Sequence, residues 1–173
     1  SRRDLFAEGY ASPTNPAKYR YRRVDEPLTS DVLKEHLRGS IVVGVYPILT
    51  DHTVGWAAVD FDGNPSDEIP FAGAYAAARR QQDALRAAGV PSYIERSRSG
   101  NGAHVWVFLE EHMAAAVVRR AIKALLLPDI TLDRLFPFQD TLTQSRPLGN
   151  LIALPDFGEA VKLGNSMFLD DEG

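Results

Sequence analysis

Two aspartates stand at the end of a strongly apolar run, in "AAVDFDG", at a spacing that suits metal binding. Alternate residues of a β-strand point to the same face, so Asp60 and Asp62 would present their carboxylates side by side. Two such charges repel each other and raise one pKa unless a cation lies between them. The pattern is typical of a site for a hard divalent cation. The alternative is a polar strand end that runs into a turn.

A second candidate site lies in "ERSRSGNGAH", between two runs with strand-like alternation. It offers the hydroxyls of Ser97 and Ser99, the guanidinium of Arg98, and backbone N–H groups that two glycines leave accessible. His104 opens the next strand and can donate through a ring nitrogen. These donors suit phosphate oxygens, whereas the alternative is a glycine-rich hairpin with a structural histidine. The glycine–lysine–serine signature of a P-loop is missing.

A third acidic residue for this site is less clearly marked. The stretch "LDRLFPFQDTL" presents Asp133 and Asp140. Asp140 follows an apolar run and is placed to face the pair from a strand edge, whereas Asp133 is a candidate cap of a short helix. Spacing alone does not choose between them.

The elements that would position these residues follow from hydrophobic periodicity and from glycine and proline stops. Helices are predicted at 29–39, 70–89 and 111–127, and strands at 41–49, 53–62, 91–97, 103–110, 150–155 and 166–170. The first two strands are predicted to form a hairpin. The order β-β-α-β-β-α-β predicts an α+β fold: an RRM-like mixed sheet with helices packed on it and a small N-terminal α/β extension.

The composition fits a single compact domain of 173 residues. We expect an irregular basic arm over 1–28 and one catalytic domain over 29–173, which the ending "FLDDEG" suggests is cut from a longer protein. The chain has no cysteine, which excludes disulfides and thiolate zinc sites and fits a cytoplasmic location. No apolar run reaches the roughly 18 residues of a membrane helix. The net charge of −4 argues weakly against nonspecific coating of nucleic acid.

An ordered set of motifs now resembles one family. These motifs are "VVGVYPIL", "AAVDFD", "ERSRSGNGAHVWVF", "LFPFQDTL", "GNLIALP" and "GNSMFLD". Together they resemble the archaeo-eukaryotic primase superfamily, and more narrowly the primase domain of TOTE conflict systems and the CRISPR-associated primase-polymerases. The similarity runs from about residue 29 to the end of the chain.

The resemblance implies a DNA-directed primase-polymerase, a nucleotidyltransferase that makes primers and extends chains by two-metal catalysis. It implies that two divalent ions, Mg²⁺ or Mn²⁺, are held by three carboxylates, those of Asp60, Asp62 and Asp140. It further implies a triphosphate site formed by Ser97, Arg98, Ser99, Asn101 and His104. The partners implied are a single-stranded DNA template, a primer and nucleoside triphosphates, with fused or associated helicase, nuclease or CRISPR proteins.

One departure concerns the N-terminal region, where relatives often carry a cysteine-rich, zinc-binding insertion. Here "KYRYRR" (18–23) stands without cysteine, so no zinc is expected. Basic residues interleaved with aromatics suit a nucleic-acid surface. Arg20, Arg22 and Arg23 are therefore hypothetical template or primer contacts, and unchanged DNA affinity after their replacement by alanine would remove that hypothesis.

Two rival functions stay open at this point. A metal-dependent nuclease would use the same carboxylates but has less need of a triphosphate site. A non-catalytic RRM-like module would bind nucleic acid through aromatic side chains on the exposed face of its sheet. Trp106 and Phe108 alternate suitably for that role, but we interpret both as core residues, and this function leaves the aspartate pair unexplained.

Overall fold

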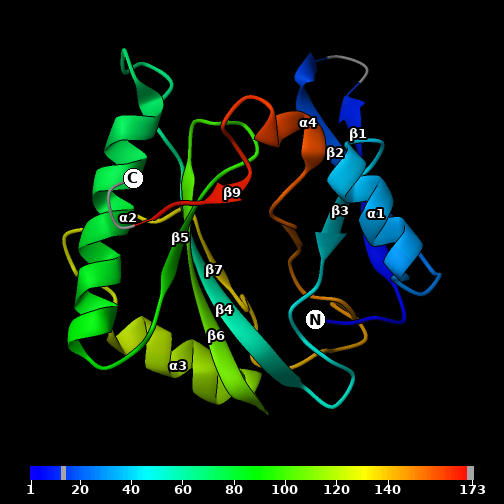
Figure 1. The fold of residues 1–173 in the computed structure, drawn as a ribbon. Helices are drawn as coiled ribbons and strands as arrows, with labels where there is room; N and C mark the ends of the chain where they lie inside the picture. The colour runs from blue at the N-terminus through cyan, green and yellow to red at the C-terminus, as the bar shows by residue number, and fades with distance from the viewer. Residues whose placement is uncertain (13–14, 171–173) are drawn as a thin grey trace.

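The computed structural model of the chain describes residues 1–12 and 15–170, which form two antiparallel sheets and four helices (Figure 1). The helices are α1 (Ser30–Arg38), α2 (Pro70–Ala87), α3 (Ala115–Ala124) and α4 (Gly158–Val161). The strands are β1 (Phe6–Ser12), β2 (Asn15–Val24), β3 (Val42–Val45), β4 (Thr53–Phe61), β5 (Tyr93–Arg96), β6 (Ala103–Ala114), β7 (Arg134–Phe136), β8 (Ile152–Ala153) and β9 (Met167–Phe168). Among these residues no helix combines the length and the apolar character needed to cross a membrane.

The larger sheet has the RRM-like arrangement. Its strand order is β7-β4-β6-β5-β9, and the chain runs β4-α2-β5-β6-α3-β7 through it. Numbered along the chain, the first four strands of this unit therefore lie in the order 4-1-3-2, the order of a β-α-β-β-α-β unit. The predicted α+β fold with helices packed on an RRM-like sheet is confirmed. The pairings are all antiparallel among the described strands, where a mixed sheet was expected.

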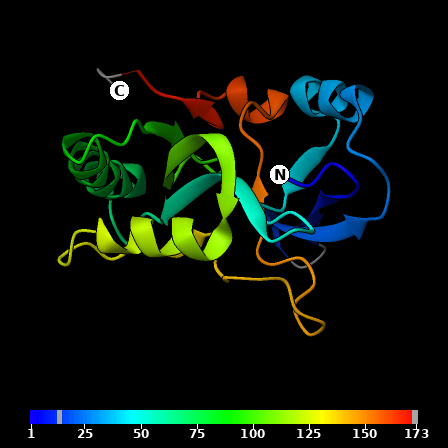
Figure 2. The same cartoon turned by 90° about the horizontal axis from the view of Figure 1, so that it is seen from below.

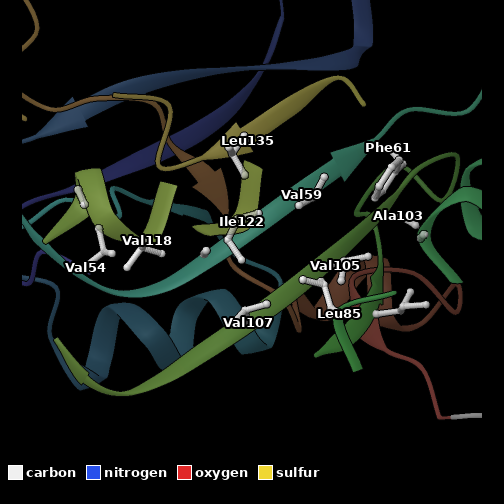
Figure 3. Close-up of a cluster of buried hydrophobic side chains, with 14 of the residues drawn as sticks. Val54, Val59, Phe61, Leu85, Ala103, Val105, Val107, Val118, Ile122 and Leu135 are labelled. Carbon is white, nitrogen blue, oxygen red and sulfur yellow. The ribbon is translucent and has the colours of Figure 1, made fainter. Parts of the chain in front are cut away.

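Helices α2 and α3 cover one face of this sheet. Val59 and Phe61 of β4, with Val105 and Val107 of β6, point into a core closed by the two helices (Figure 3). The helices contribute Ala74, Ala78 and Leu85 from α2 and Val118 and Ile122 from α3. Because side chains alternate along a strand, the residues between these valines point to the opposite face. Asp60 and His104 therefore lie on the face that the helices leave free.

The N-terminal residues form a second sheet, with strand order β2-β1-β3-β8, rather than an irregular arm. The prediction for 1–28 is wrong in this respect, although Pro13 and Thr14 lie outside the described residues. Residues of both sheets meet in a second core that includes Phe6, Val45, Trp56 and Trp106. Figure 2 shows α2 and α3 on the side of the molecule away from the N-terminal strands and α1.

The predicted hairpin of 41–49 with 53–62 is also wrong. A tight turn does join the two runs, since the Leu49 N–H donates to the carbonyl of Thr53. However, β3 pairs with β1 and β8 in the smaller sheet, whereas β4 pairs with β6 and β7 in the larger one. All four residues of β3 are buried, because the strand has partners on both edges and its side chains pack against the second core on one face and against Phe157 and Ala160 on the other.

Two further elements differ from their predicted bounds. Strand β6 continues to Ala114, so α3 begins four residues later than the predicted start at 111. The region after 129, expected to hold a short helix or turn, contains β7 directly after Asp133. Trp106 is buried as expected, but Phe108 is 51% exposed and is not a core residue.

Candidate active site

A cleft of about 420 Å³ is lined by residues of both sheets, on the face that α2 and α3 leave free. It gathers most of the residues that the sequence marked, namely Asp60, Asp62, Ser97, Arg98, Ser99 and His104. Residues that sequence analysis did not assign to a site complete the lining: Tyr19, Tyr21, Glu95, Arg134, Phe136, Asn150, Leu151, Ile152 and Ala153. The two predicted sites are therefore parts of one cleft.

The aspartate pair stands where β4 ends. Asp60 lies opposite His104 of β6 on one side and Arg134 of β7 on the other, so two basic side chains flank one carboxylate. Asp62 follows the strand. Burial raises the pKa of Asp62, and the negative charges of Asp60 and Asp133 raise it further, against the lowering effect of Arg134 and His104. Burial and the two neighbouring acids therefore both disfavour the charged form of Asp62.

The third acid near this pair is Asp133. Its N–H donates to the carbonyl of Asp60 (2.8 Å), and its carboxylate pairs with Nε of Arg134 (2.8 Å), which lines the cleft, although Asp133 itself does not. Asp140 instead pairs with Nη1 of Arg119 (3.0 Å) on α3, the helix that packs against the other face of the sheet. The charge of Asp133 thus acts on Asp62, whereas Asp140 lies on the side of α3. Asp133 also lies at the start of β7 rather than capping a helix.

A buried hydrogen-bond network fixes the side chain of Asp60. Nδ1 of His104 and Nε1 of Trp106 both donate to Oε2 of Glu95, at 2.9 and 2.7 Å, and Nε2 of His104 lies 3.3 Å from Oδ1 of Asp60. Burial alone would lower the pKa of His104, but its hydrogen bonds to the two carboxylates and their charges outweigh burial and raise it to about 10. The histidine is therefore an imidazolium that fixes the orientation of Asp60.

Glu95 is the centre of this network, and its side chain is buried, so its loss should destabilise the fold. We expect Glu95→Ala to lower the free energy of unfolding by about 2–5 kcal/mol, because two buried donors then lose an acceptor worth about 1–3 kcal/mol each. Urea denaturation measures this change. The exposed Glu110 of β6 is the matched control, with an expected change within about 0.5 kcal/mol for Glu110→Ala. Equal losses in the two variants would contradict the network.

Among the polar residues of the loop between β5 and β6, some stabilise the turn and others line the cleft. Ser97 pins the loop, because its hydroxyl accepts from the N–H of Gly102 (3.0 Å) and meets the Ser99 hydroxyl (3.1 Å). Arg98 and Ser99 line the cleft together with Ser97. Asn101 is exposed and lies outside the lining, so the structure does not bring it to the site.

Gly63 explains how the loop comes so close to the aspartates. A Cβ atom at this position would lie 2.2 Å from the carbonyl oxygen of Asn101 and 2.4 Å from that of Pro70. Only glycine allows backbones to approach this closely. The glycine of "DFDG" therefore lets the polar loop pack directly against the residues that follow Asp62.

Three site residues missed by sequence analysis carry charge or hydrogen bonds. Glu95 and Arg134 gave no local signal, since a single charged residue in a short strand does not indicate burial or a site. Tyr19 did have one, because "KYRYRR" alternates tyrosine with arginine at the period of a β-strand. That alternation turns Tyr19 and Tyr21 toward the cleft. Arg22 pairs with Glu8 and Arg23 with Asp25 at the surface, while the side chain of Lys18 lies outside the described residues.

The carboxylates suit a divalent cation in chemistry. Among residues 1–12 and 15–170, no three His, Cys, Asp or Glu side chains already surround a common point in the manner of a metal site. Their donor atoms are hard carboxylate oxygens, which Mg²⁺ and Mn²⁺ prefer. The pKa of Asp62 is raised first by burial and then by the charges of Asp60 and Asp133, and a bound cation would offset the effect of those charges. The donor chemistry of Asp60 and Asp62, which both line the cleft, therefore fits such ions, and Asp133 adds negative charge beside the pair.

The fold and the cleft together define an α+β domain whose RRM-like sheet carries an acidic pair and an arginine- and serine-bearing loop on its free face. The family model described as the archaeo-eukaryotic primase domain of TOTE conflict systems matches residues 7–173, and the chain belongs to this family. A search among curated proteins found no match. Membership implies primase or nucleotidyltransferase activity in general, with nucleic acid and nucleoside triphosphates as substrates and divalent metal ions as cofactors.

Proposed function

We propose that this domain is a primase-polymerase that copies single-stranded DNA, starting chains and extending them by transfer of nucleotides. The observation that carries this proposal is the meeting of an acidic pair and phosphate-type donors in one cleft of about 420 Å³. A nuclease would need the acids alone. The presence of Arg98 and Ser99 beside Asp60 and Asp62 supports a triphosphate as the substrate.

Each side chain has a defined task in this proposal. Asp60, Asp62 and Asp133 would hold two divalent ions, Mg²⁺ or Mn²⁺, which neutralise charge on the reacting phosphate and lower the pKa of the attacking hydroxyl. Arg98 and Ser99 bind the β- and γ-phosphates. His104 is held by Glu95 and keeps the Asp60 carboxylate in one orientation.

The loop residues therefore separate into ligands and supports. Arg98 and Ser99 are the proposed phosphate ligands, because both line the cleft, whereas Ser97 and His104, which also line it, are engaged by Gly102 and by Glu95 and Asp60. Ser97 supports the turn through its bond to Gly102, and His104 supports Asp60. Asn101 is left without a proposed role at the phosphates, since it lies away from the cleft lining.

The test is incubation with single-stranded DNA and labelled nucleotides in Mn²⁺ or Mg²⁺, with and without a primer. We expect products in both reactions. Extension that strictly requires a primer would reduce the proposal to a polymerase, and absence of both products and metal-dependent nucleotide binding would remove it. Running ribonucleotides and deoxynucleotides in parallel identifies the preferred sugar.

A second function is favoured by one observation, the exposed rings of Tyr93 (48%), Phe108 (51%) and Phe168 (38%). All three rings belong to the larger sheet, β7-β4-β6-β5-β9, which we call the catalytic sheet. Such rings on an RRM-like sheet stack on nucleic-acid bases in non-catalytic binding modules. A protein of this kind would bind single-stranded DNA without incorporating nucleotides, and it would bind equally well with Asp60 replaced. The same incubation separates the two functions.

A further inference from the structure

Arg98 is held in the cleft by two tyrosines of the other sheet. The guanidinium carbon of Arg98 lies 3.8 Å from the centre of the Tyr19 ring, and the same side chain interacts with the Tyr21 hydroxyl, whose pKa burial raises and Arg98 lowers in part. Both tyrosines belong to β2, whereas Arg98 belongs to the turn between β5 and β6 of the catalytic sheet. The contact therefore joins the strand pair β1–β2, which we call the N-terminal hairpin, to the loop that lines the cleft.

The backbone around Tyr21 is shaped to receive its ring. Tyr21 stands opposite Gly9 of β1, and a Cβ at Gly9 would lie 3.0 Å from Cε1 of the tyrosine. A Cβ at Gly44 of β3 would lie 3.2 Å from that atom. Two neighbouring strands thus carry glycine where the ring lies, so the ring crosses the sheet closely and its hydroxyl reaches the cleft.

Stacking of Arg98 on the Tyr19 ring leaves the N–H groups of its guanidinium available to bind an anion. An arginine that stacks on a ring uses the face of its planar guanidinium, while its N–H groups point outward in the plane. Those N–H groups are the donors that bind phosphate oxygens. A long side chain that is already fixed in this way loses less conformational entropy when an anion binds.

We propose that Tyr19 and Tyr21 are positioning residues that preorganise Arg98 for the triphosphate of the incoming nucleotide. This inference rests on the proposed function, because it assigns the partner that sets up one of its phosphate ligands. It also gives the N-terminal hairpin a part in nucleotide binding. The hairpin is then a wall of the nucleotide site in addition to any contact that its arginines make with DNA.

The test measures binding of inorganic tripolyphosphate and of dATP in Mg²⁺ buffer by calorimetry. We expect Tyr19→Ala to weaken both by roughly 5- to 30-fold, the usual range for a partly desolvated cation–π contact. Tyr19→Phe keeps the ring and should stay within about twofold. Tyr21→Phe removes only the hydroxyl and should cost roughly 2- to 10-fold. Tyr10 of β1, which is 42% exposed, provides the control Tyr10→Ala, with no change expected.

A double-mutant cycle separates positioning from general support of the fold. In an Arg98→Ala background, Tyr19→Ala should cause no further loss, because the side chain that it positions is gone. Independent, additive losses would overturn the inference, as would weaker binding of dATP with unchanged binding of tripolyphosphate. Stronger binding by Tyr19→Ala would overturn it too, since the tyrosine would then block the site.

The outcome for the wild-type protein distinguishes this inference from the function on which it rests. Wild-type protein that binds neither probe and makes no product removes the proposed function and the inference together. Wild-type protein that binds both probes, with losses that do not depend on Arg98, removes the inference alone. Should Tyr19→Ala fail to fold, Tyr21→Phe in the two Arg98 backgrounds decides, because it preserves the ring that packs over the glycines.

Discussion

Asp60→Asn is expected to reduce nucleotide incorporation by about 10³-fold or more while the protein stays folded. The substitution keeps the shape of the side chain and an oxygen that accepts from His104, but it removes a charge from the acidic pair. A divalent ion at a phosphoryl-transfer site contributes several kcal/mol to the transition state, and each 1.36 kcal/mol corresponds to about tenfold in rate. Primer extension under single-turnover conditions measures the loss.

The structure offers a matched control for this variant. Asp67 follows the same strand, is exposed, and accepts from the side chain of Asn64, so Asp67→Asn removes an equal charge outside the cleft. It should retain nearly full activity. Melting temperatures of both variants check the fold. Incorporation by Asp60→Asn at more than a tenth of the wild-type rate would contradict a catalytic role for this carboxylate.

The sequence was sufficient for the elements whose pattern is local. Helix α2 has an apolar stripe, a proline at its start and a glycine after its end, and these features mark it without reference to the rest of the fold. The period-two alternation of β6 likewise marked that strand, with His104 near its start. The pairing of the two motifs in one cleft follows, because β4 and β6 are neighbours in an RRM-like sheet.

The errors arose where partners distant in sequence decide the structure. Strand β3 is joined to β4 by a tight turn, so local rules predict a hairpin, yet the strands that pair with β3 are β1 and β8 of the smaller sheet. Strand β1, "FAEGYAS", is short of β-branched residues, and its place is set by pairing with β2 and β3. Contacts such as that of Tyr19 with Arg98 depend on both sheets and have no local signal at all.

The site residues also divide into those that a local sequence pattern marks and those that only distant contacts make important. Asp60 and Asp62 were recognisable because their spacing alone sets their relative orientation on a strand. Glu95 was not, because its importance comes from the His104 and Trp106 side chains that meet it across the sheet. A single acidic residue in a strand has the same appearance whether it is exposed or at the centre of a buried network. Burial, which the sequence did not provide, separates the two cases.

The second prediction with a large expected effect is that Asp133, and not Asp140, is the third acidic residue needed for nucleotide incorporation. Asp133→Asn is expected to lower incorporation by at least about 10²-fold, because its carboxylate adds to the negative charge that a divalent ion would offset at Asp62. Asp140→Asn should keep at least half of the activity. Asp140 pairs with Arg119 of α3, half of its side chain is exposed, and the catalytic sheet lies between that helix and the cleft.

Metal titration gives this comparison a second readout. If Asp133 helps to hold a cation, the Mn²⁺ concentration for half-maximal activity should rise in Asp133→Asn and stay unchanged in Asp140→Asn. The opposite result, with loss confined to Asp140→Asn, would mean that the segment after β7 rearranges to bring Asp140 to the pair when substrates bind. Equal and small effects would leave Asp60 and Asp62 as the complete acidic set. Because Asp133 is anchored through its N–H to the carbonyl of Asp60, the first result is the one that requires no movement of the backbone.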